Sequence, residues 1–436
     1  MRRPIHALAV GSAVALGLAA ALALSACARH QAALKPVVPP ARVAMRPVTA
    51  AVLADSSSGG EPTPRARTIW IVSLDGRVTK RTVPAQFYDQ RTFPLSPDGR
   101  ALLYADGSLW PHQSALRLRE LDLDTGKDRV VIAAAPLVWG WDTTGRIVAV
   151  TANRAATPSF GSPSLRDVTL WRGEAGHLET AALEPTAVPI DITSFIAADT
   201  GAAYFGGSTT LGLRGPSEQH VWRYDFARHR LELTFSHQGM RWGLGSRPGD
   251  TGSELALGGI PAHQDALTSG LRMNRYTIVY VTTANGFGYQ PMISGVDVLR
   301  LPDMRVVRSI TVTPTPTLGA PYYPLFNADF SRYLITVPIG REPQYGARSE
   351  PRNVAQVEVA GRRVESVSSP PSLLAVPLGY LGSSQAFIYR GVDGTRVAVF
   401  LKEPGAAPRV ILRLGQVRGR ETLSDGSVLL GVQYAK

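Results

Sequence analysis

The strongest constraint on the fold of this chain is a repeat of short hairpins that begins at Thr68. The clearest copy spans residues 93–104 and consists of a strand, the turn Pro97-Asp98-Gly99 and a second, apolar strand. Proline presets φ, aspartate bonds its own backbone and glycine accepts a positive φ, so this triplet is typical of a tight turn. Looser copies of this first kind of hairpin follow at 139–150, 196–205, 242–257, 326–337, 376–389 and 423–432.

A second kind of hairpin alternates with the first and combines a strand of alternating character, a turn and a β-branched strand. Its copies lie at 69–83, 116–132, 168–183, 221–235, 296–312, 354–367 and 397–414. Two hairpins make one four-stranded sheet, so seven of each kind make seven sheets. A period of roughly 45–55 residues built from strands is typical of a β-propeller. The sequence therefore predicts an all-β, seven-bladed β-propeller of four-stranded antiparallel blades over residues 68–436.

Two turns carry a resemblance to a known family. Ser-Pro-Asp-Gly-Arg at 96–100 and Asp-Leu-Asp-Thr-Gly-Lys at 122–127 resemble the WD40-like propeller repeats of the TolB family. The resemblance covers most of residues 68–436 and implies a propeller that binds protein partners or an envelope component. Because the repeat starts with a hairpin of the second kind and ends with one of the first, we expect N- and C-terminal strands to pair in one blade. Such pairing closes the ring and removes an exposed sheet edge.

The N-terminus has the features of an export signal. Arg2 and Arg3 precede an apolar run at 8–24, and a Leu-Ser-Ala-Cys sequence ends at Cys27. This sequence resembles the lipobox of bacterial lipoproteins, which implies a signal peptide at 1–26 and a fatty-acylated Cys27 of the palmitate type. An uncleaved membrane-spanning helix stays open as the alternative, because the run is borderline in length for spanning. Both interpretations predict a domain at the extracytoplasmic face of the cell membrane.

The segment that follows is predicted to be a tether. Residues 27–67 are rich in alanine, proline, valine and serine and lack periodicity, which is typical of a disordered linker. About forty such residues would hold the domain on the order of 35 Å from the membrane. Cys27 is the only cysteine, so no intrachain disulfide forms and stability must come from packing.

The net charge of +12 leaves the class of partner open. A basic balance is compatible with nucleic acid, an anionic membrane surface or an anionic wall polymer. The arginines are spread along the chain rather than gathered into one run, which favours no dedicated anionic ligand. We therefore expect a monomer without a nucleic-acid partner, bound to the membrane by its lipid and to an unidentified envelope protein or polymer.

The segments that join the two hairpins of a blade are longer than the turns within hairpins. They lie at 106–115, 151–167, 206–220, 259–295 and 338–353, and we expect them to share one face around the channel mouth, where loops on a rigid scaffold bind ligands. Insertions without a ligand are the alternative. The candidate ligand-face residues are His112, His220, His263, Arg272, Arg275, Tyr289, Arg341, Tyr345 and Arg348. Trp139, Trp141 and Trp242 are expected on or beside innermost strands, either lining the channel or packing between blades.

Motifs for catalysis are absent from the sequence. It contains no Gly-x-Ser-x-Gly elbow, no His-Glu-x-x-His pair and no Walker loop, and it predicts neither a cofactor nor a metal. The sequence therefore favours a binding or scaffold lipoprotein over an enzyme. Two alternatives remain: a propeller hydrolase or lyase whose loop histidines His112, His220 and His263 converge on a metal, and a carbohydrate-binding propeller.

Overall fold

The structure is a computed structural model in which every described element is a β-strand. It describes residues 51–57, 67–73, 75–83, 95–106, 117–154, 165–184, 190, 192–210, 217–238, 252–256, 277–284, 292–300, 305–311, 325–327, 330–338, 352–361, 363–367, 375–381, 385–418, 422–423 and 427–433. The chain divides into two units, Met1–Arg46 and Pro47–Lys436, and all the strands belong to the second.

Five sheets have four antiparallel strands each. In hydrogen-bonded order, sheet 1 is β28 (Ser427–Gln433), β1 (Ala51–Ser57), β2 (Arg67–Val72) and β3 (Val78–Val83). Sheet 3 is β10 (His177–Ala182), β9 (Leu165–Glu174), β8 (Ile147–Arg154) and β7 (Pro136–Trp141). Sheet 4 is β11 (Ile192–Ala198), β12 (Ala202–Thr210), β13 (Ser217–Asp225) and β14 (Arg230–Gln238). Sheet 5 is β15 (Gly252–Ala256), β16 (Thr277–Ala284), β17 (Met292–Arg300) and β18 (Arg305–Thr311), and sheet 6 is β19 (Leu325–Phe326), β20 (Arg332–Pro338), β21 (Arg352–Glu358) and β22 (Val364–Ser366).

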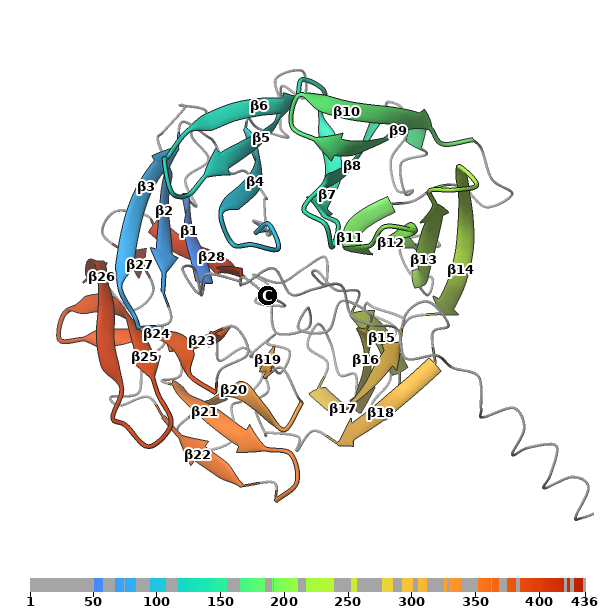
Figure 1. Ribbon diagram of the computed structural model, residues 1–436. Coiled ribbons are helices and arrows are strands. Elements are labelled where there is room, and N and C mark those ends of the chain that lie inside the picture. Colours follow the sequence, from blue (N-terminus) through green and yellow to red (C-terminus); the bar gives the residue numbers. More distant parts are fainter. Residues whose placement is uncertain are drawn as a thin grey trace, which may run out of the picture. The chain divides into compact units, whose positions relative to one another are not determined.

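Two further sheets depart from this number of strands. Sheet 2 has three strands, β4 (Ala101–Asp106), β5 (Arg117–Asp122) and β6 (Asp128–Ile132), and an isolated bridge from Leu95 to Leu102 stands where a fourth strand would pair. Sheet 7 has five, β23 (Val376–Tyr380), β24 (Phe387–Asp393), β25 (Arg396–Lys402), β26 (Arg409–Arg418) and the two-residue β27 (Thr422–Leu423). The chain is therefore an all-β propeller with four-stranded antiparallel blades (Figure 1).

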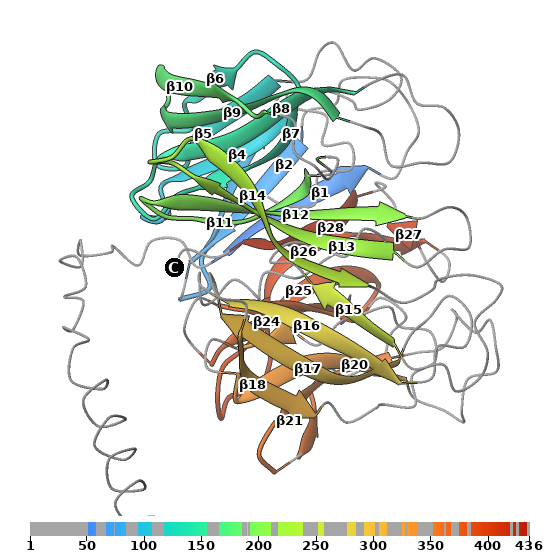
Figure 2. The same cartoon turned by 90° about the vertical axis from the view of Figure 1, so that its right-hand side faces the viewer.

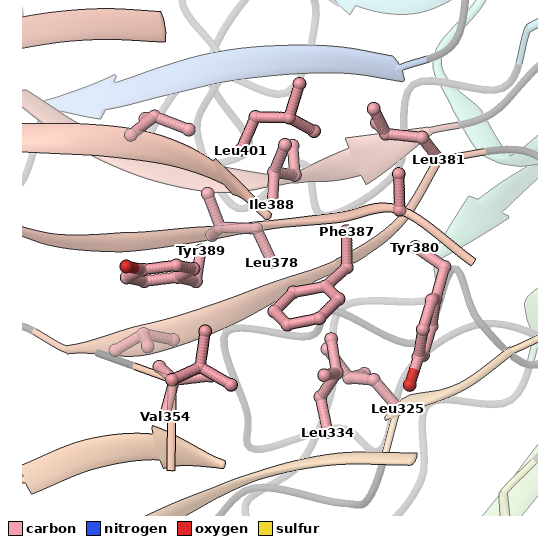
Figure 3. Close-up of a cluster of buried hydrophobic side chains, with 14 of the residues drawn as sticks. Leu325, Leu334, Val354, Leu378, Tyr380, Leu381, Phe387, Ile388, Tyr389 and Leu401 are labelled. Atoms are coloured by element: carbon pink, nitrogen blue, oxygen red, sulfur yellow. The ribbon is translucent and has the colours of Figure 1, made fainter. Parts of the chain in front are cut away.

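The hydrophobic core lies between neighbouring sheets, because the two faces of a central strand pack against different neighbours. In β4, Leu102 and Tyr104 pack with Ile69 of sheet 1, whereas Leu103 packs with Ile147 of sheet 3. The same kind of cluster joins sheets 3 and 4, 5 and 6, 6 and 7, and 7 and 1. Figure 3 shows the cluster between sheets 6 and 7, where Leu325, Leu334 and Val354 meet Leu378, Phe387 and Tyr389. These clusters link the sheets in the order 5–6–7–1–2–3–4.

The inner hairpins share one turn geometry, which explains why their repeat is readable in the sequence. The residue that follows the first strand donates its N–H to the carbonyl of the residue at or just before the start of the second, over 2.8 Å from Asp142 to Arg146. A carboxylate there also accepts backbone N–H groups, as Asp142 Oδ1 does from Thr144 and Arg146 at 2.9 Å each. The residues in this role, each directly after the first strand or bridge of its hairpin, are Ser96, Asp142, Asp199, Asn327 and Leu381.

The first strand of sheet 1 corrects the predicted tether. Residues 27–67 were expected to lack structure, but Ala51–Ser57 forms β1 and pairs with both β2 and β28. The run from Ala50 to Ala54 is a short apolar segment between Thr49 and Asp55, a pattern that is compatible with a strand. Composition alone did not reveal this strand, because the serine- and glycine-rich run at 56–60 follows the apolar residues closely. The rest of the predicted tether, its Cys27 and the signal segment lie outside the described residues, apart from Arg67 at the start of β2.

The pairing of the two ends also differs in detail from the prediction. The hairpin expected at 423–432 is divided between two sheets in the described part of the chain: Thr422–Leu423 pairs with β26 of sheet 7, whereas β28 pairs with β1 in sheet 1. Sheet 1 thus combines three strands from the N-terminal side with one from the C-terminal side. Among the described residues there is no helix long and apolar enough to cross a membrane.

Candidate functional site

The two ends of each sheet carry different kinds of connection. At one end, which we call the turn end, the connections between strands have two residues (175–176) to six residues (403–408). The longer connection 257–276 is the one exception among the described strands. At the opposite end, the loop end, the connection between the second and third strands is longer than the turn-end connections of the same sheet in all sheets but 5 and 7. These loop-end segments are 58–66, 107–116, 155–164, 211–216, 285–291 and 339–351, whereas sheet 7 has only 394–395. Figure 2 shows the strands running between the two ends.

Hydrogen bonds tie the turns of one sheet to each other. Leu123 donates its N–H to the carbonyl of Arg100 over 2.8 Å, and so links the outer turn of sheet 2 to its inner turn. Phe226 makes the same bond to Gly201 in sheet 4 over 3.0 Å. Both partners are backbone groups, so the link depends on the shape of the turns rather than on particular side chains. The two turns at this end are thereby held together within sheets 2 and 4.

Arginines extend these links between sheets. Arg81 of sheet 1 donates to the carbonyl of Leu123 in sheet 2 over 3.0 Å, and Arg409 of sheet 7 donates to the carbonyl of Asp75 in sheet 1 over 2.7 Å. Arg172 pairs with Asp142 in its own sheet at 3.0 Å. Its Cζ also lies 3.7 Å from the ring centroid of Phe226 in sheet 4, within the range of a cation–π contact. These contacts bind the turn ends of sheets 7 and 1, of sheets 1 and 2, and of sheets 3 and 4 to each other.

At the loop end, one carboxylate holds both ends of the segment 107–116. Asp106 is the last residue of β4 and Arg117 is the first of β5. Asp106 Oδ1 accepts the backbone N–H of Arg117 at 3.1 Å, and Asp106 Oδ2 accepts Arg117 Nη2 at 2.8 Å. Arg119 Nη1 donates to the same Oδ2 at 3.1 Å, and Asp106 is only 6% exposed. This contact fixes the points at which the segment leaves and re-enters the sheet.

The contact continues into a balanced ionic network. Arg119 Nε donates to Asp128 at 3.0 Å, and the Tyr104 hydroxyl donates to Asp128 Oδ2 at 2.7 Å. Burial and the hydrogen bond to Asp128 raise the pKa of Tyr104 far above its usual range. Burial lowers the pKa of Arg119, but its hydrogen bonds to Asp128 and Asp106 and its interactions with the charges of Tyr104 and Asp128 together outweigh burial, so the pKa is raised. Tyr104 therefore stays neutral and Arg119 stays cationic near pH 7, which suits support of a loop rather than proton transfer.

Replacing Asp106 by alanine tests this support. The change leaves Arg117 without its carboxylate and Arg119 with Asp128 alone, so we expect the free energy of unfolding to fall by about 2–3 kcal/mol. Proteolysis within 107–116 should become faster, and mass spectrometry of the fragments measures it. Asp393→Ala is the control, because it removes the exposed pair with Arg413 at 2.7 Å. Equal proteolysis of the two variants would contradict a role for Asp106 in holding the segment.

His220 does not lie in a joining loop as predicted. It belongs to strand β13, is 1% exposed, and its ring centroid lies 6.1 Å from that of Trp222. The predicted loop 206–220 was too long, because β12 extends to Thr210 and β13 begins at Ser217. The alternation of rings at His220, Trp222 and Tyr224 was the signal for a strand.

The predicted joining segment 259–295 is divided by strand β16. Thr277 pairs with Arg300 next to the turn before β18, so residues 257–276 connect strand ends at the turn end. Ala284 pairs with Met292, so 285–291 connects strand ends at the loop end. His263, Arg272 and Arg275 fall in the first segment and Tyr289 in the second, contrary to the single shared loop that was expected. All four lie outside the described residues.

The remaining candidates divide between core and undescribed positions. Trp139 and Trp141 lie in the innermost strand β7, are half-buried, and pack against the cluster between sheets 2 and 3. His112, Arg341, Tyr345, Arg348 and Trp242 lie outside the described residues; the first four fall in segments between loop-end strand ends. Within the described part of the chain, no group of three or more histidine, cysteine, aspartate or glutamate side chains is placed to hold a metal ion.

Comparisons with known proteins show a similarity in fold and do not identify a function. No protein-family model matches the sequence, and no curated protein matches it. TolB from Acinetobacter baumannii is 12% identical with a TM-score of 0.40, and the match covers 88% of this chain and 65% of the TolB chain. An oligogalacturonate lyase in complex with manganese is 13% identical with a TM-score of 0.42, covering 83% of this chain and 89% of the lyase.

A third similar structure is the β-propeller domain of the trilobed protease from Pyrococcus furiosus, described as having an open velcro topology. It is 10% identical with a TM-score of 0.32, and the match covers 84% of this chain and 80% of that domain. Likenesses of this size carry no statement about function. The assignment as a propeller rests on the chain's own sheets and on the clusters between them.

Proposed function

We propose that the seven sheets are the blades of a single ring, closed in sheet 1 by β1 and β28. Two observations support this. Apolar clusters join six neighbouring pairs of sheets, from sheet 5 through sheets 6, 7, 1, 2 and 3 to sheet 4. In addition, Val52 pairs with Gln433 and Ser57 with Ser427, which brings strands from opposite ends of the domain into one sheet. In a closed ring of this kind each sheet keeps only short, protected edges.

We further propose that the protein is a binding or scaffold lipoprotein, anchored through Cys27 at the extracytoplasmic face of the cell membrane. Its loop end would bind a protein or another envelope component. The observation that carries this proposal is the asymmetry of the two ends in all sheets but 5 and 7. In those five sheets, segments of six residues (211–216) to thirteen (339–351) join the second and third strands at the loop end, whereas short turns join the strands at the other end. Variable loops on a rigid scaffold are the usual location of binding sites.

A capture experiment with matched variants tests the binding proposal. The full-length lipidated protein serves as bait in detergent-solubilised membranes from its own host. We expect one envelope component to be enriched, and a bait in which a glycine–serine linker of equal length replaces 339–351 to lose it. A turn-end control, Arg230→Ala with Glu232→Ala, removes an exposed ion pair of 3.4 Å and should keep it.

Two outcomes would contradict the proposal. Enrichment that survives replacement of every loop-end segment would place binding elsewhere. Empty eluates from all baits, together with turnover in a screen of hydrolase and lyase substrates, would favour the enzyme alternative.

A further inference from the structure

We propose that the turn end of the propeller faces the membrane and that the loop end points away from it, toward the envelope space. The proposal rests on the proposed anchoring at Cys27 and adds to it the direction in which the binding loops are presented. The partner then belongs to the envelope space and not to the lipid surface that holds the protein.

The direction of strand β1 carries this proposal. Ala51 pairs with Val72, the last residue of β2 before the turn to β3, so β1 begins at the turn end. Ser57 pairs with Ser427, the first residue of β28, so β1 finishes at the loop end. The chain therefore enters the propeller at Ala51 from the turn end, and a lipid anchor earlier in the sequence pulls on that end.

The length of the tether makes this attachment point matter. Ala51 follows Cys27 by 24 residues, and a flexible chain of that length has a root-mean-square span of roughly 27 Å. Strand β1 has 7 residues and separates the two ends by roughly 23 Å. Strands β2 and β3 lie outside β1 in sheet 1 and add about 10 Å to the path around the outer edge. Placing the loop end against lipid thus stretches the tether beyond its relaxed span.

The charges at the turn end neither favour nor oppose this orientation. Exposed charges there alternate in sign among the described residues, with Arg77 beside Asp75 at 3.1 Å and Arg230 beside Glu232 at 3.4 Å. Such pairs give little net attraction to an anionic surface. The orientation therefore comes from the point of attachment, and we expect it to depend on the length of the tether and little on salt.

Two labelling positions in one blade measure the orientation. Thr395 lies in the loop-end turn before β25, and Ala407 lies in the turn-end connection after it, so one strand separates them and both are exposed. Cys27 is the only native cysteine and is proposed to be acylated, so Thr395→Cys and Ala407→Cys each give a single free thiol. The lipidated full-length protein, labelled with a fluorophore, is bound to phosphatidylcholine vesicles that carry a headgroup quencher.

We expect quenching at Ala407→Cys to exceed that at Thr395→Cys by about twofold, and duplication of 28–50 to reduce the difference. Equal quenching at both positions, or stronger quenching at Thr395→Cys, would overturn the orientation while leaving the anchoring intact. A Cys27→Ser version of each labelled protein should stay off the vesicles. If that version binds as well as the acylated protein, or if the acylated protein does not bind, the anchoring and the orientation fall together.

Discussion

Replacing Asp142 by alanine is expected to lower the free energy of unfolding by about 3–5 kcal/mol. The Asp142 side chain is fully buried and pairs with Arg172 Nη2 at 3.0 Å. Its Oδ1 also accepts the Thr144 hydroxyl at 2.7 Å and the N–H of Arg146 at 2.9 Å. The variant leaves a largely buried guanidinium without its carboxylate and an inner turn without its acceptor. Both losses carry the cost of unpaired buried polar groups.

The effect should reach beyond sheet 3. Arg172 Nη2 also lies 3.4 Å from the carbonyls of Asp199 and Thr200 in sheet 4, and its Cζ lies over the ring of Phe226. Among the described residues, Asp142 is the carboxylate of sheet 3 that forms an ion pair with Arg172. Without it, no ion pair within that sheet holds the guanidinium in position. Hydrogen exchange should therefore increase in the inner turns of both sheets 3 and 4.

Urea unfolding, followed by tryptophan fluorescence, measures the change. Asp124→Ala is the control, because its pair with Arg100 spans 3.5 Å with both side chains about half exposed and should contribute at most about 1 kcal/mol. Asp142→Asn keeps an acceptor but no charge and should fall between the two. A loss for Asp142→Ala no larger than that for Asp124→Ala would show that Arg172 finds another partner.

This turn also shows how far sequence reasoning reaches. Trp-Gly-Trp-Asp-Thr-Thr-Gly at 139–145 is recognisable as a copy of the hairpin repeat, because turn chemistry is local and Asp and Gly have fixed roles in it. The pairing of Asp142 with Arg172 was not predicted. This pairing depends on which face of β9 lies against the inner turn. Neither the composition nor the spacing of the residues predicts that face. The propeller class was thus readable, whereas the contacts that join the blades were not.

The same limit applies to strand pairing and to the candidate site. Strand β1 was missed because its apolar run is short, and its partner β28 is distant in the sequence. The segment 257–276 was assigned to the wrong end of sheet 5, because it was counted with the residues up to 295 as one joining segment, although β16 is the second strand of that sheet. Since each strand reverses the chain, one misplaced strand transfers a whole loop to the other end. The ligand-face residues outside the described part of the chain remain predictions.

Removal of β28 is expected to have the largest effect of any change considered. Ending the chain after residue 426 deletes the strand that pairs with β1 from Val52 to Ser57. The lost ladder alone contributes about 5 kcal/mol, at roughly 1 kcal/mol for each hydrogen bond. That is a large part of the 5–15 kcal/mol of a whole domain, about the range in which native proteins lie. The deletion also exposes the edge of β1, and exposed edges promote aggregation.

Thermal unfolding and size-exclusion chromatography of the truncated protein measure this effect. We expect an aggregated product or one without a cooperative transition, and partial recovery of the monomer when a peptide of residues 427–436 is added. The control ends after residue 433, where β28 is complete, and should unfold like the full chain. A truncated protein that stays monomeric with an unchanged melting temperature would mean that sheet 1 holds without β28. The closure of the ring would then have to lie in another contact between the sheets.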